Sequence, residues 1–205
     1  VSDLQDLLHE SLDVVKMMTV APEILSDEAL AYLLSTNHLT LSAGHSAASF
    51  AEATRGFEKG IHAVTHMWNA MSPLHHREGG LPVAVSNHKS VFASIIVDGI
   101  HVDYEVVKLS KALLGERLFL ITDAVASCQK GIYQHILNGD HYVLPDGTLS
   151  GSALTMIKAI QNCVEHVGLP IDEAIRMATL YPAKLIGRED LGRITIGSKA
   201  NLVVF

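Results

Sequence analysis

Cysteine is scarce in this sequence. Only Cys128 and Cys163 occur among its 205 residues, and neither belongs to a C-x-x-C pair. Disulfide-stabilised domains and cysteine zinc sites both depend on several cysteines at characteristic spacings. The sequence therefore excludes both kinds of framework and indicates two reduced thiols in a cytoplasmic protein.

Long apolar runs and an excess of positive charge are also missing. The chain has no run of about 18 apolar residues, the length that a membrane-spanning helix needs, and its first residues lack the basic and apolar regions of a signal peptide. It carries 15 Lys and Arg against 22 Asp and Glu, a net charge of −7. We therefore expect no membrane partner and no nucleic-acid partner, because nucleic acid would require a basic face.

Histidine, in contrast, is abundant, with 12 residues in the chain. Neutral imidazole is the commonest metal ligand in proteins and a frequent acid–base group. Hydrophobic residues make up 48% of the sequence, which is enough for one domain with a sizeable core. Composition therefore favours a single domain, and the positions of the histidines become the main functional question.

Short β-branched runs alternate with segments of helical periodicity, a pattern typical of βαβ units around a parallel sheet. The runs predict five strands, at 14–20, 38–43, 61–65, 91–97 and 117–122. Capping residues and apolar spacing predict helices at 26–34, 50–60, 103–115, 152–167 and 172–182. In the helix that Asp103 begins, Val106, Leu109 and Leu113 are predicted to lie on one face.

The predicted strand ends fall at regular intervals, each of which fits one strand plus one helix. A complete (β/α)8 barrel of such units needs about 200 to 250 residues or more, so about three further strands are expected upstream of Val1. Residues 1–191 are thus predicted to form the C-terminal portion of a TIM (β/α)8 barrel, an α/β fold. Residues 192–205 have a strand, Gly-Ser turn, strand pattern, which predicts entry into a small flanking β-domain.

Polar side chains follow four consecutive predicted strands: His45, His66, Asp98 with His101, and Asp123. In a parallel barrel the active site lies at the C-terminal ends of the strands, so these residues should converge. Two histidines from neighbouring strands suit a divalent transition metal, with zinc expected first and iron, cobalt or manganese as alternatives. Asp123 could act as the base beside a metal-bound water or bind the metal itself, and the sequence leaves both roles open.

Several motifs occur in a fixed order along the chain: A-P-E at 21–23, S-A-G-H-S at 42–46, T-H-M-W-N-A-M at 65–71, D-G-I-H at 98–101, T-D-A at 122–124, L-S-G-S at 149–152 and a G-R-I-x-x-G-x-x-A-N-L tail at 192–202. Together they resemble the N-acetylglucosamine-6-phosphate deacetylases of the amidohydrolase superfamily. The resemblance covers essentially the whole chain.

This resemblance implies a distorted TIM barrel with a flanking β-sandwich, a homodimer, and hydrolysis of a phosphorylated amino sugar to glucosamine 6-phosphate and acetate. It implies that His45 and His66 bind the metal and that Asp123 is the catalytic acid and base. Substrate contacts are implied for Asn69, Ala70, Arg77, His101, Leu149, Ser150 and Gly151. The third metal ligand of the family is a Glu in an E-G-P-F motif, which this sequence lacks, so we expect it upstream of Val1.

The loop around Arg77 departs from the family pattern. The chain has H-R-E-G-G at 76–80 where G-R-E-P-G is frequent, so the arginine is kept while the loop loses the stiffness of a proline. His75 and His76 could help to bind phosphate or could be solvated loop residues. Trp68 replaces a smaller apolar residue, so a different pocket shape is expected.

Other polar residues have more than one interpretation each. Glu23 could be a ligand, an acid near the metal or a structural hydrogen-bond acceptor. His62 could be a second metal ligand or a packed core histidine. Ser150 and Ser152 could cap the following helix or offer backbone N–H groups to a polar ligand, and these two roles are compatible.

Two rival functions use the same scaffold. A dihydroorotase-like enzyme, which opens a cyclic amide, usually has a carboxylated lysine, but no lysine stands at a predicted strand end before His45, and Lys16 lies at the start of a strand. A barrel without metal could serve as an assembly or regulatory protein. The joint presence of His45, His66 and Asp123 argues against that second function.

Overall fold

The computed structural model describes residues 2–9, 14–36, 38–131 and 134–204. The chain divides into two compact units, which we describe separately. The first unit comprises Val1–Ala93 and Ala183–Phe205, and the second comprises Ser94–Pro182. Of the helices described, none has the length and apolar character needed to cross a membrane.

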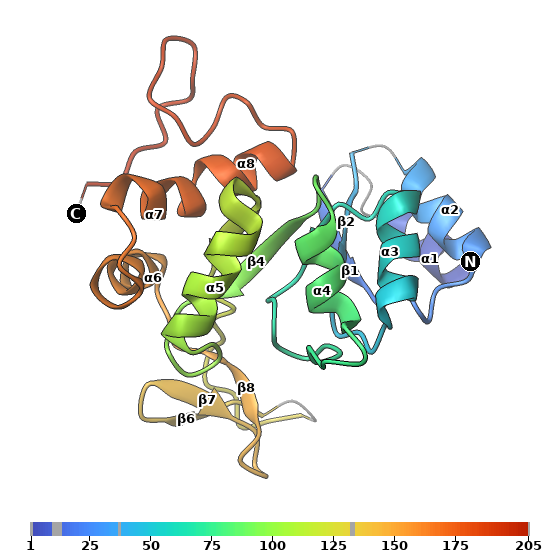
Figure 1. Cartoon of the computed structure of the whole chain (residues 1–205), viewed down its shortest axis with the longest axis horizontal. Helices are drawn as coiled ribbons and strands as arrows, with labels where there is room; N and C mark the ends of the chain where they lie inside the picture. The colour runs from blue at the N-terminus through green and yellow to red at the C-terminus, as the bar shows by residue number, and fades with distance from the viewer. Residues whose placement is uncertain (1, 10–13, 37, 132–133, 205) are drawn as a thin grey trace. The chain divides into compact units, whose positions relative to one another are not determined.

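The first unit is built on parallel strands that are hydrogen-bonded in chain order. They are β1 (Met17–Val20), β2 (Thr40–Ala43), β3 (Ala63–Val64) and the first residues of β4 (Phe92–Ile96). Its helices are α1 (Ser2–His9), α2 (Asp27–Ser35), α3 (Phe50–Lys59) and α4 (Gly80–Asn87) (Figure 1). The predicted parallel βαβ pattern is therefore confirmed here, although α1 and α4 were not predicted.

Local sequence signals explain the helix ends in this unit. Ser26 caps α2 by accepting a hydrogen bond from the Ala29 N–H at 3.1 Å. Ser49 and Glu52 form a reciprocal capping box at the start of α3, and Gly60 ends that helix. These caps fix where each helix departs from the strand before it, and thus how long the strand-end loops are.

The second unit contains the rest of β4 and its neighbour β5 (Leu118–Ile121). Its helical segments are α5 (Tyr104–Leu114), the 3-10 turn η1 (Gly115–Arg117), α6 (Met156–Asn162), the π-helix η2 (Cys163–Val167), α7 (Ile171–Ala178) and the start of α8 (Leu180–Leu185). Three antiparallel strands, β6 (Ile136–Asn138), β7 (His141–Val143) and β8 (Leu149–Ser152), lie at the lower end of Figure 1. These three strands were not predicted, because their short sequences, I-L-N, H-Y-V and L-S-G-S, show no apolar alternation.

The apolar face that the sequence indicates on α5 is not the face that the structure buries. The structure buries Val107, Ser110 and Leu114, whereas Leu109 and Leu113 are 49% and 45% exposed. The helix has apolar residues on two adjacent stripes, one residue or about 100° apart. Periodicity alone could not choose between them.

The predicted helix at 152–167 begins later than expected. Leu149–Ser152 forms β8, and Thr155 is the residue that caps α6, accepting from the Lys158 N–H at 3.2 Å. The end at Gly168 is as predicted, with Gly168 in the left-handed conformation. The interpretation of Ser150 and Ser152 as helix caps is therefore wrong.

The tail does not form the predicted strands. Within 192–204, which the structure describes, the backbone makes turns and bends with no strand, and Ile194 is 88% exposed. A strand needs a hydrogen-bonded neighbour, and these residues are not paired with one. The assignment of 192–205 to a flanking β-domain stays a prediction.

Candidate active site

His45 and His66 lie side by side in the first unit. Each follows the end of a strand by two residues, His45 after β2 and His66 after β3, and these strands are neighbours. Their Nε2 atoms are 2.9 Å apart and their rings meet edge to face. His66 is buried, while His45 is exposed. The structure thus brings the two predicted metal ligands together.

The pair fits a divalent metal as two of its ligands. With metal–nitrogen bonds of about 2.0 to 2.1 Å, nitrogens this close can both reach one ion at an angle of about 90°. Among the described residues, no group of three or more His, Cys, Asp or Glu side chains gathers to complete such a site. The expected third ligand, a Glu upstream of Val1, therefore stays a prediction.

Glu23 holds the loop that follows His45. One carboxylate oxygen accepts from the Ser46 hydroxyl and the other from the Ala47 N–H, both at 2.6 Å. Because both oxygens are engaged, the structure favours a positioning role for Glu23 over a role as ligand. His62 is exposed, so its interpretation as a core histidine is wrong.

Thr65 joins three strands directly before His66. Its Oγ1 lies 2.7 Å from Ser42 Oγ and 2.9 Å from Thr19 Oγ1. A Cβ at Gly44 would lie 2.7 Å from Thr65 Cβ, so only glycine lets the two strand ends approach this closely. His66 itself has a φ of 35°, a conformation that non-glycine residues rarely adopt. The surrounding bonds hold this strained backbone in place.

The loop after His66 lies beside the loop after His45. Ser46 donates its N–H to the Ala70 carbonyl at 3.0 Å. Trp68 and Ala70 both have positive φ, 81° and 45°, so the backbone between them turns sharply. This contact places two of the predicted substrate residues, Asn69 and Ala70, next to the histidine pair.

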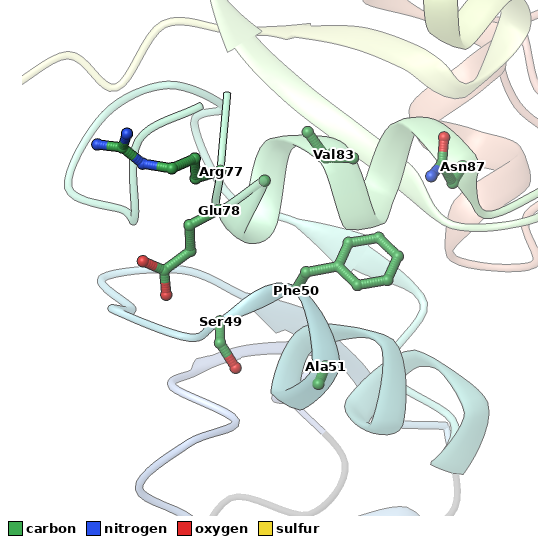
Figure 2. A pocket seen from close by; sticks show the side chains of 8 residues that line it. Ser49, Phe50, Ala51, Arg77, Glu78, Val83 and Asn87 are labelled. Atoms are coloured by element: carbon green, nitrogen blue, oxygen red, sulfur yellow. The ribbon is translucent and has the colours of Figure 1, made fainter. Parts of the chain in front are cut away.

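Arg77 lies at the tip of a tight turn. His75 and Glu78 exchange backbone hydrogen bonds at 3.0 and 3.1 Å, and the Arg77 side chain is exposed. Figure 2 shows Arg77 at the rim of a pocket lined by Ser49, Phe50, Ala51, Arg77, Glu78, Gly79, Val83 and Asn87. Neither His45 nor His66 is among these lining residues. His75 and His76 are exposed neighbours, which favours solvated loop histidines.

In the second unit, Asp98 orients His101. Asp98 accepts from the N–H groups of Ile100 and His101 and lies 2.6 Å from His101 Nδ1. Burial opposes ionisation of Asp98, but the hydrogen bonds from His101 and the two amides outweigh it and lower the pKa of Asp98. Because Nδ1 donates to Asp98, Nε2 is left to face a ligand, and this buried atom has no hydrogen-bond partner among the described residues.

Asp123 follows β5, the neighbour of β4, and its side chain is exposed. Strand β8, which contains Leu149, Ser150 and Gly151, passes directly beside it: a Cβ at Gly151 would lie 3.2 Å from the Asp123 carbonyl oxygen. Ser150 Oγ also lies 3.1 Å from His135 Nδ1, a contact that no sequence pattern indicated. In this unit, His101 and Asp123 thus follow neighbouring strands, and Leu149, Ser150 and Gly151 lie on a strand of the second sheet beside Asp123.

Asn162 is a further residue that sequence reasoning missed. It is buried at the end of α6, and its Nδ2 donates to the Val97 carbonyl at 2.8 Å. Val97 directly precedes Asp98. An amide side chain between the apolar residues Ile160 and Cys163 was the available signal, because a buried amide needs a specific partner.

Comparison with known proteins agrees with this arrangement. The amidohydrolase family profile matches residues 4–205. The chain is 38% identical over 217 residues to N-acetylglucosamine-6-phosphate deacetylase of Haemophilus influenzae, covering 99% of this chain and 56% of that protein.

Solved structures agree as well. The crystal structure of N-acetylglucosamine-6-phosphate deacetylase from Pasteurella multocida matches with a TM-score of 0.88 at 35% identity, over 98% of this chain and 55% of that chain. A mutant of the Mycobacterium smegmatis enzyme, in complex with N-acetyl-D-glucosamine-6-phosphate, matches with a TM-score of 0.83 at 31% identity, over 91% of this chain and 52% of that chain.

The chain thus spans about half the length of these relatives. The match in fold confirms the predicted α/β architecture as a partial barrel of the amidohydrolase type. On the family profile and these likenesses, the chain belongs to the amidohydrolase family.

Proposed function

We propose that the protein removes the acetyl group from N-acetylglucosamine 6-phosphate. The observation that carries this proposal is the approach of His45 Nε2 and His66 Nε2 to 2.9 Å at the ends of neighbouring parallel strands. The deacetylase relatives and the family motifs support the choice of substrate.

Different residues of this chain would bind the metal, transfer the proton and contact the substrate. A divalent metal held by His45 and His66, zinc first and iron, cobalt or manganese as alternatives, would polarise the amide and activate water. Asp123 would take a proton from the attacking water and return it to the departing amine nitrogen. His101, oriented by Asp98, would present Nε2 to the substrate.

Substrate positioning completes the proposal. Asn69 and Ala70 would line the sugar side, and Leu149, Ser150 and Gly151 the acetyl side. Arg77 would bind the phosphate, since a guanidinium suits phosphate oxygens in charge and geometry. A homodimer in the cytoplasm belongs to the same proposal and rests on the family resemblance.

The test uses the protein at its full natural length, loaded with zinc. Acetate release from N-acetylglucosamine 6-phosphate is compared with release from unphosphorylated N-acetylglucosamine, and dihydroorotate serves as the cyclic amide. We expect efficient turnover of the phosphorylated sugar alone. Turnover of the cyclic amide in its place would support the rival amidohydrolase function, and full activity after removal of all metal would contradict the metal-dependent mechanism.

A further inference from the structure

The backbone of Asp123 is held in an uncommon conformation. Its φ is 50°, in the left-handed region that residues with a side chain rarely adopt. Such a conformation persists only where the surrounding structure determines it, and it occurs often at functional sites. The residues that hold Asp123 therefore also decide where its carboxylate points.

The hydrogen bonds that hold the backbone around Asp123 come from Ser152, the last residue of β8. The Ser152 N–H donates to the Asp123 carbonyl at 2.9 Å, and the Ser152 carbonyl accepts from the Val125 N–H at 3.1 Å. The Ser152 hydroxyl donates to the Thr122 carbonyl. One residue thus bonds to the backbone before, at and after Asp123.

The Ser152 hydroxyl makes hydrogen bonds both as a donor and as an acceptor. Ser152 is completely buried, and its Oγ also accepts from the Leu154 N–H at 3.0 Å. A hydroxyl has one hydrogen to donate, and here it is directed at Thr122. Because Thr155 caps α6, the hydroxyl of Ser152 has no part in that helix cap.

The neighbouring glycine makes this contact possible. Gly151 has a φ of 126°, and a Cβ there would lie 2.7 Å from the side chain of Val125. Glycine at this position therefore lets β8 come close enough for Ser152 to reach both Thr122 and Asp123. Ser152, the last residue of the L-S-G-S segment, therefore has a structural function. This function is separate from the substrate contacts proposed for Leu149, Ser150 and Gly151.

We infer that Ser152 is a positioning residue that sets the direction of the Asp123 carboxylate. The inference rests on the proposed role of Asp123 in the reaction. Without the hydroxyl, the Thr122 carbonyl loses its buried donor and the left-handed turn can relax. A carboxylate displaced by about 1 Å from the reacting atoms lowers turnover by about 100-fold, while groups that bind the sugar and phosphate stay in place.

The test compares Ser152→Ala with Ser110→Ala in the full-length, zinc-loaded protein. Ser110 is also fully buried in the second unit, and its hydroxyl donates to the Val106 carbonyl within α5 at 2.7 Å. Both variants thus lose one buried hydroxyl and one hydrogen bond to a carbonyl. We expect Ser152→Ala to lose about 10- to 100-fold in kcat with KM within about twofold, and Ser110→Ala to keep its kcat.

The outcomes separate this inference from the proposed function. An inactive wild type would overturn both, whereas an active wild type with unchanged kcat in Ser152→Ala, or an equal loss in Ser110→Ala, would overturn the positioning role alone. If Ser152→Ala does not fold, Ser152→Cys is tested in its place, because the cysteine thiol is a weaker hydrogen-bond donor and its Cβ–S bond is longer than the Cβ–O bond of serine. A reduced kcat at ordinary KM and metal content is then expected, and a kcat equal to wild type would refute the inference.

Discussion

The two units position their reactive side chains in different ways. In the first unit, nearby strand ends hold the histidines: Thr65 bonds to Ser42 on the adjacent strand, and Glu23 holds the loop after His45. In the second unit Asp98 orients His101 locally, but the bonds to the strand ends themselves come from residues further along the chain, since Ser152 reaches Thr122 and Asn162 reaches Val97. We therefore expect changes in the first unit to alter metal binding and changes in the second to alter turnover.

The largest expected effect is that of Asp123→Asn. An amide has the shape of the carboxylate but cannot accept the proton, so kcat should fall by about 100- to 10,000-fold. Steady-state kinetics measured beside metal analysis should show this loss at unchanged metal content.

Asp103→Asn is the matched control for Asp123→Asn. Asp103 caps α5 in the same unit by accepting from the Glu105 N–H at 2.8 Å, and Asn caps helices equally well. Loss of metal from Asp123→Asn would instead mean that Asp123 is a metal ligand. It would contradict the expectation that changes in the second unit alter turnover and not metal binding.

The next largest effect should be that of Glu23→Gln in the first unit. The amide keeps one acceptor oxygen but directs an NH₂ group at either Ser46 or Ala47, which loosens the loop after His45. Residues that support metal ligands typically contribute about 10- to 100-fold to metal affinity or activity. Equilibrium dialysis against zinc should therefore show weaker binding.

Glu58→Gln is the control for that measurement, because Glu58 is exposed on α3 in the same unit. Zinc affinity equal to wild type in Glu23→Gln would mean that the loop holds His45 without the carboxylate. A loss of equal size in both variants would point to a general effect of charge.

A smaller effect is expected for Asn162→Leu. The Val97 carbonyl would lose its buried partner, and Val97 leads into the Asp98 loop that orients His101. One such hydrogen bond contributes about 0.5 to 1.5 kcal/mol, so KM for the sugar phosphate should rise by about 2- to 10-fold.

Gln161→Leu provides the control for Asn162→Leu, because Gln161 is the adjacent amide and is exposed. Zinc affinity should be normal in both variants. A loss of zinc from Asn162→Leu at an unchanged KM would contradict the assignment of this strand end to substrate binding.

The sequence predicted the first unit better than the second. The reason is that the bonds that support the site are local in the first unit and come from distant residues in the second. The strands and the pairing of His45 with His66 follow from local periodicity and from the rule that parallel strands end on one side. Their supporting bonds also lie within the strand-end motifs, as Ser42 and Thr65 show.

The parts that could not be predicted depend on contacts between distant residues. The side chains of Ser152 and Asn162 meet carbonyl groups 30 and 65 residues earlier in the chain. The buried face of α5 depends on which of two apolar stripes meets its neighbours. The strands β6 to β8 have only three or four residues each, which is too few for a periodic pattern to show in their sequence.

The smallest effect on activity is expected for Glu173→Gln, which affects stability alone. Burial raises the pKa of Glu173, but hydrogen bonds from Lys111, Arg176 and Tyr181 outweigh it and hold that pKa at about 2, below its ordinary 4.5. A depressed pKa in the folded state stabilises the protein above pH 4.5, and the contribution is lost as the pH falls towards 2. Linkage gives an upper limit of about 3 kcal/mol for this contribution.

Chemical denaturation of the wild type should therefore show an unfolding free energy that decreases between pH 5 and 3. In Glu173→Gln the unfolding free energy should depend less on pH, and kcat and zinc content at neutral pH should be unchanged. Equal pH dependence in both proteins would mean that the network around Glu173 does not stabilise the second unit through its charge.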